Sequence, residues 1–149
     1  MILRWLVATL HLLTLPLGLG AIWMRARGLA RVTGSEGLAR IFVADNLWGV
    51  AAVLWIATGL WRAFGGLEKG TFYYLHDRAF HAKMGLLLLI LLLEIWPMTT
   101  LIRWRIRVRR GQAVDILVAP LLARVSYVQA GLVILMVFAA TAVARGYFY

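Results

Sequence analysis

The sequence is poor in the residues that soluble domains and thiol-based sites require. The 149-residue chain contains no cysteine, 3 prolines and only 6 acidic residues. Without cysteine it forms no disulfide and binds no metal through thiolates. Charged residues make up 15% of the chain, whereas a soluble domain carries roughly 25%. Apolar residues reach 63% and the mean hydropathy is +0.85, so the composition predicts an integral membrane protein.

The excess of basic residues is large, with 16 Lys and Arg and a formal net charge of +10. A nucleic-acid-binding protein would gather such cations on one face, usually within a recognisable motif. Here they flank apolar runs, and no nucleic-acid-binding motif is present. We therefore expect the lipid bilayer, and not a nucleic acid, to be the partner of this chain.

Four windows are long and apolar enough to cross a bilayer, which takes about 20 residues each. They cover approximately residues 3–24, 42–61, 83–102 and 125–143. Gly28, Gly34 and Gly37 are expected to interrupt any helix between the first two spans, and residues 103–110 are expected to form a basic link after the third. The sequence predicts one all-α membrane domain over residues 1–149, a four-helix up-down-up-down bundle.

The distribution of cations predicts the orientation. Ten of the 16 lie in the two links that follow the first and third spans. Positive charge accumulates on the cytoplasmic side, so both links are expected there, with both termini outside a bacterial inner membrane. The ten are Arg25, Arg27, Arg31, Arg40, Arg103, Arg105, Arg107, Arg109, Arg110 and Arg124. The dense run at residues 103–110 is either a topology anchor or a surface for anionic lipid.

Ionisable residues inside the hydrocarbon cost several kcal/mol and therefore suggest function. His11 lies in the first span with Gly18 two turns further on, and His81 enters the third with Gly85 one turn deeper. A glycine below a histidine leaves a recess for a porphyrin edge, and two imidazoles from facing helices hold haem in many bundles. The alternative is that each histidine only hydrogen-bonds to a neighbouring helix.

The depths of the two histidines do not match well. At 1.5 Å per residue, His11 lies about 5 Å and His81 about 14 Å outside the membrane centre. The axial ligands of one haem should lie closer in depth, so Met84, one turn deeper than His81, is an alternative partner. A five-coordinate iron held by His11 is another.

Glu94 lies in the third span, three residues before Pro97, where the helix is expected to kink. Burial favours a neutral carboxylic acid at this position, able to relay protons or polarise a substrate. A protonated Glu94 that merely bonds a neighbouring helix is the alternative. Its candidate partners on the fourth span are Ser126, Tyr127 and Gln129.

Two resemblances cover these positions. His11, Tyr74-Leu75 and Phe80-His81-Ala82-Lys83 resemble the small membrane protoporphyrinogen oxidase HemJ over about two spans. Tyr73-Tyr74-Leu75-His76, Ala82-Lys83-Met84-Gly85 and Glu94-Ile95-Trp96-Pro97 resemble a family of predicted bacterial membrane proteins of unknown function, over nearly the whole chain.

The HemJ resemblance implies a haem b redox protein. It implies His11 and His81 as iron ligands, with Lys83 and Arg78 on the propionates or on a porphyrin substrate. Glu94 and Lys83 become candidate catalytic residues, and quinone becomes a candidate electron acceptor. Two other functions remain open: a haem-free accessory or assembly subunit of a larger membrane complex, and a small transporter. A homo-oligomer is expected in the haem and transporter cases.

Overall fold

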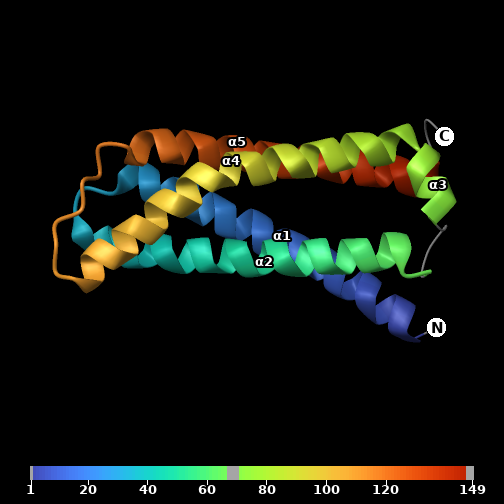
Figure 1. Ribbon diagram of the computed structural model, residues 1–149, viewed down its shortest axis with the longest axis horizontal. Helices are drawn as coiled ribbons and strands as arrows, with labels where there is room; N and C mark the ends of the chain where they lie inside the picture. The colour runs from blue at the N-terminus through green and yellow to red at the C-terminus, as the bar shows by residue number, and fades with distance from the viewer. Residues whose placement is uncertain (1, 67–70, 147–149) are drawn as a thin grey trace.

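The computed structural model describes residues 2–66 and 71–146. The side chains of Tyr73 and Tyr74, which carry part of both resemblances, lie outside the described residues. Four long helices run alternately up and down along the chain: α1 (Ile2–Arg31), α2 (Leu38–Phe64), α4 (Arg78–Arg109) and α5 (Ala119–Arg145). Two short helices, η1 (Ser35–Gly37) and α3 (Thr71–His76), lie in the connections (Figure 1).

All four long helices are long and apolar enough to span a membrane, and the described residues contain no strand. The predicted all-α bundle of four membrane-spanning helices is confirmed. We call the end at which α1 and α4 finish and α2 and α5 begin the basic end, and the other the terminal end (Figure 1).

The helices pack in the order α2, α1, α5, α4. Contacts are extensive between α1 and α2, between α1 and α5, and between α4 and α5, but sparse between α2 and α4. The bundle is therefore least closed along the side where α2 faces α4.

Glycine does not end the first helix where the sequence predicted. α1 continues through Gly28 to Arg31, because Gly28 lies against Ile41 of α2 and leaves room for the two helices to approach. A Cβ atom at Gly28 would lie 2.9 Å from Ile41 Cγ1, closer than such atoms can approach. The expected interruption at Gly28 is wrong, and the turn occurs at residues 32–37 instead.

α4 remains helical through most of the predicted basic link, as far as Arg109. The helix starts at an Asp77 cap whose carboxylate accepts from the backbone N–H groups of Ala79 and Phe80 at 2.7 and 3.2 Å.

α4 contains Pro97, and its last turns diverge from α5 towards the start of α2 (Figure 1). Proline removes one helical hydrogen bond and commonly bends a helix in this way.

The buried apolar side chains form three separate clusters along the bundle. The cluster at the basic end contains Leu29, Leu38, Ile41, Leu101, Trp104, Ala119, Leu122 and Ala123. The middle cluster contains Ala21, Ile22, Trp48, Ile90, Ala130, Val133 and Met136. The cluster at the terminal end contains Ala63, Ala79, Phe80 and Val143.

Candidate functional site

A fully buried arginine lies between the basic-end and middle clusters. Arg25 of α1 has an exposed fraction of 0%. Its Nη1 and Nη2 atoms donate to the two carboxylate oxygens of Glu94 on α4, at 2.6 and 2.8 Å. This paired, parallel geometry is the strongest arrangement between a guanidinium and a carboxylate. It ties the first spanning helix to the third.

A second ion pair extends this contact to α2. Arg25 Nη1 also donates to Asp45 Oδ1 at 2.8 Å, and the other oxygen of Asp45 accepts from Arg105 Nη2 at 2.6 Å. Arg105 additionally donates to the Phe42 carbonyl at 3.1 Å and lies over the Phe42 ring at 5.1 Å. Two cations and two carboxylates thus form one cluster whose formal charges cancel.

Two polar residues of α5 complete the cluster. Arg25 Nη2 donates to the Gln129 amide oxygen at 2.9 Å, and Arg25 Nε donates to Ser126 Oγ at 3.2 Å. The Gln129 amide nitrogen donates to Glu94 at 2.8 Å and to the Ile90 carbonyl at 3.2 Å. A guanidinium has five N–H donors, and the five bonds of Arg25 use all of them.

We call Arg25, Asp45, Glu94, Arg105, Ser126 and Gln129 the charge network. All four spanning helices contribute to it, and apolar clusters lie on both sides of it along the bundle. Its carboxylates retain slight exposure, 17% for the Glu94 side chain and 12% for Asp45. In such surroundings each charge depends on its partners, because losing one leaves an uncompensated buried charge.

The predicted surroundings of Glu94 are therefore partly confirmed. Gln129 bonds it directly, and Ser126 belongs to the same network through Arg25. Tyr127 does not take part, since its ring packs edge-on against Trp23 at 5.2 Å. The sequence did not predict Arg25 as a partner of Glu94, yet its guanidinium donates to both Glu94 carboxylate oxygens.

His11, the first candidate haem ligand, lies half-buried against α2. Its Nδ1 atom is 2.8 Å from Thr58 Oγ1, and its ring lies 6.1 Å from that of Trp55. The single hydroxyl proton of Thr58 is donated to the Leu54 carbonyl at 2.6 Å. When Thr58 keeps its proton on this carbonyl, Thr58 accepts from His11 and the proton of a neutral imidazole lies on Nδ1, with the lone pair on Nε2.

The glycines around the two histidines differ from the expectation. A Cβ at Gly18 would lie 3.3 Å from Ala51 Cβ and 3.6 Å from the Trp48 ring, so the expected recess below His11 is filled by α2. Gly59 is the glycine that borders the imidazole, 3.3 Å from His11 Cε1 when a Cβ is added. Gly85, below His81, faces open space.

The candidate ligands on α4 have different surroundings. His81 is exposed, and its Nδ1 lies 2.9 Å from the Asp77 carbonyl within its own helix. Met84 is half-buried and packs against the terminal-end cluster. Arg78 is exposed at the first turn of α4. Lys83 is half-buried.

A protein-only metal centre is not present in residues 2–66 and 71–146. No three His, Cys, Asp or Glu side chains lie together as possible ligands there. A haem iron places a smaller demand on the protein, since the porphyrin supplies four nitrogens and the chain supplies one or two.

Comparison with protein families gives a match over almost the entire chain. A family model described as "Predicted membrane protein (DUF2214)" matches residues 3–147. The chain belongs to this family. No curated protein and no solved structure matches it. The resemblance to a predicted membrane protein family of unknown function is confirmed, and that to HemJ is not shown.

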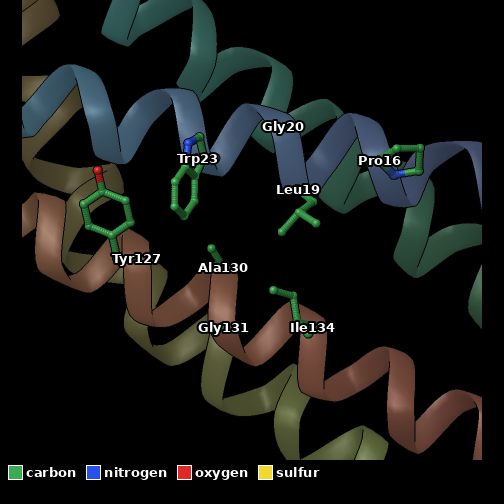
Figure 2. Close-up of a pocket in the computed structure, with 8 residues that line it drawn as sticks. All are labelled: Pro16, Leu19, Gly20, Trp23, Tyr127, Ala130, Gly131 and Ile134. Atoms are coloured by element: carbon green, nitrogen blue, oxygen red, sulfur yellow. The ribbon is translucent and has the colours of Figure 1, made fainter.

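This DUF2214 member also has an apolar groove of about 550 Å³ between α1 and α5. Figure 2 shows Trp23 and Tyr127 at one end of it and Pro16 at the other. Gly20 and Gly131 form flat parts of its walls, and the remaining lining residues are Leu19, Ala130 and Ile134. The groove lies outside the charge network and holds no ionisable group in its lining except the Tyr127 hydroxyl.

Arg25 was not predicted as a site residue of this family member, because it was counted with the cations of the first link. The available signal was its spacing from Ile22 and Leu29, three residues before and four after. Such residues share one helix face, and both are buried. An arginine on the apolar face of a spanning helix requires a carboxylate partner, and Asp45 and Glu94 are the acidic residues of the other spans.

Proposed function

We propose that this DUF2214 member is a haem b-binding redox protein of the membrane in which His11 is an axial ligand of the iron. The observation that carries the proposal is the hydrogen bond from His11 Nδ1 to Thr58. Haem-ligating histidines commonly donate the other ring N–H to a fixed acceptor, which sets the tautomer and the ring orientation. A half-buried His11 that donates Nδ1–H to Thr58 would have that form, and its Nε2 would bind the iron.

Lys83 supports the same proposal from α4. Its ammonium forms no salt bridge within the described residues, although the side chain is half-buried. A half-buried cation without an acidic partner is costly. In the proposal, Lys83 neutralises a propionate of the porphyrin, and Arg78 reaches the second from the first turn of α4.

In this proposal His81 or Met84 of α4 would be the second residue to hold the haem. A bound haem b would supply one-electron transfer, with quinone or a porphyrin as the partner that lies within the bilayer. Thr58 would orient His11, and Lys83 and Arg78 would orient the porphyrin through its propionates. Glu94 has no part in this site, because Arg25 and Gln129 bond both of its oxygens.

Pigment content tests the proposal. Protein purified after haem-replete expression is expected to show a Soret band that His11→Ala abolishes or reduces several-fold. His76→Ala is the matched control, since His76 is exposed and its Nδ1 and ring contact Phe72 of its own helix α3. His81→Ala and Met84→Ala separate the candidate second ligands by their spectra. Colourless wild-type protein, or equal haem in the His11→Ala variant, would refute haem ligation by His11.

The charge network favours a second candidate, a proton- or ion-coupled transporter. Buried ionisable residues often mark ion pathways in membrane proteins, and the Glu94 and Asp45 side chains keep 17% and 12% exposure. In proteoliposomes, Glu94→Gln is then expected to abolish a pH-gradient-driven flux that the wild type supports. A third outcome would instead favour an accessory subunit: the protein is colourless, supports no flux, and co-purifies with a larger complex in mild detergent.

The proposed orientation places the basic end in the cytoplasm of a bacterium and both termini outside. Since Arg25 and Arg105 belong to the charge network, eight of the ten predicted arginines remain exposed at that end. The absence of cysteine makes the test simple. Ser35→Cys in intact cells should resist a membrane-impermeant maleimide, whereas Gly66→Cys should react. The reverse labelling pattern would invert the topology.

A further inference from the structure

The last turns of α4 form a stripe of arginines on the exposed side of the basic end. Arg103 and Arg107 lie four residues apart on one face of α4, and Arg110 follows at i+7 as the residue that caps the helix C-terminus. All three are exposed, and none forms a salt bridge with a described residue. Ile102 and Ile106, exposed at 46% and 44%, border the stripe.

The opposite face of the same turns is fixed to the bundle. Trp104 is buried in the basic-end cluster, and Arg105 bonds Asp45 and the Phe42 carbonyl of α2. These contacts determine which side of the helix is turned outward. The arginine stripe is therefore held in place at the surface.

The length of α4 places the stripe at the edge of the hydrocarbon. Its 32 residues extend about 48 Å at 1.5 Å per residue, compared with a hydrocarbon thickness of roughly 30 Å. The apolar stretch of the helix ends at Ile102, immediately before Arg103. Arginines that follow an apolar stretch lie at the level of the lipid phosphates.

We propose that Arg103, Arg107 and Arg110 form a binding surface for the headgroups of anionic phospholipids in the bilayer that holds the protein. Guanidinium groups recognise phosphate oxygens in a bidentate manner, and the bordering isoleucines contact the acyl chains of the same lipids. Anionic lipid is favoured over nucleic acid because apolar side chains adjoin the cations, whereas nucleic-acid surfaces combine cations with polar or aromatic groups. This proposal does not depend on haem.

Native mass spectrometry of the whole protein, released from micelles with equal phosphatidylglycerol and phosphatidylcholine, tests the surface. Near the membrane surface each arginine favours anionic lipid by roughly fivefold. Wild-type protein is expected to retain phosphatidylglycerol at least tenfold over phosphatidylcholine. Arg103→Gln with Arg107→Gln should remove most of that preference, and Arg103→Lys with Arg107→Lys should keep much of it.

The matched control removes two exposed arginines from the terminal end, Arg4→Gln with Arg145→Gln. It lowers the net charge by the same amount and should leave the preference intact. Equal loss in both double variants would overturn the proposal, because it would mean that net charge alone attracts the lipid. So would a stripe that prefers an added oligonucleotide to phosphatidylglycerol. Circular dichroism confirms that each variant is folded.

Discussion

The contributions of Arg25 and Glu94 to the free energy of unfolding should be strongly coupled to each other. Arg25→Met leaves Glu94 with Gln129 as its only partner in the network and gives the buried cluster one excess negative charge. Glu94→Leu leaves Arg25 bonded to Asp45 and gives one excess positive charge. Breaking a buried pair in this way costs about 3–5 kcal/mol. Each single variant should lose about that much free energy of unfolding.

The double variant should be far less destabilised than the sum of the two. It leaves Asp45 paired with Arg105, which restores the charge balance, and replaces the other pair with apolar side chains. Such replacements of buried pairs are often neutral in stability. We expect the double variant to be more stable than additivity predicts by about 2 kcal/mol or more. Single hydrogen bonds between membrane helices average only about 0.6 kcal/mol, so coupling of this size requires the charges.

Reversible unfolding in mixed micelles, followed by circular dichroism as the fraction of denaturing detergent rises, measures these free energies. Arg31→Met serves as the control, since Arg31 is exposed and forms no salt bridge with a described residue. This substitution should change the free energy of unfolding by less than about 0.5 kcal/mol. The reasoning fails if the Arg25 and Glu94 variants are additive within about 0.5 kcal/mol.

Three further predictions follow from individual contacts. Gly28→Ala should lower the thermal midpoint by several degrees, because its Cβ would lie 2.9 Å from Ile41 Cγ1. Gly20 faces open space, so Gly20→Ala should leave the midpoint unchanged. Equal midpoints for the two variants would contradict the close approach of α1 and α2. Arg105→Gln should speed hydrogen exchange in the last turns of α4, since it weakens the link to Asp45; unchanged exchange would show that Trp104 alone holds them. Thr58→Val removes the partner of His11 Nδ1. In haem-loaded protein this substitution should shift the reduction potential while the haem is retained. An unchanged potential would argue against ligation by His11.

The spans could be predicted from the sequence because each is a long apolar run, and such a run has few alternatives in lipid. Their exact ends could not, because arginine does not stop a helix and Gly28 is accommodated by Ile41. The charge network was only half predicted. Glu94 was evident from its position in an apolar span, and Gln129 from its depth on the fourth. Arg25 was missed because an arginine at the end of an apolar window resembles a boundary marker.

The contacts of His11 could not be predicted from the sequence of its own helix, because they are made by residues of α2. Its spacing from Gly18 suggested a recess on the same helix face. Whether that recess is empty depends on what α2 places against it, and Trp48 fills it. The partner that matters, Thr58, lies 47 residues away in the sequence. No periodicity connects the two positions.

The distribution of the buried charges bears on how the chain enters the membrane during synthesis. The first pair of spans contributes Arg25 and Asp45 to the charge network, and the second pair contributes Glu94 and Arg105, so each hairpin supplies one cation and one anion of the network. Arg25 and Asp45 are bonded to each other within the first hairpin in the folded protein, so these two buried charges can be paired before the second half is made. When the second hairpin arrives, Arg25 gains Glu94 and Asp45 gains Arg105. Assembly of the two halves is then guided by a charge pattern that only the correct pairing of helices satisfies.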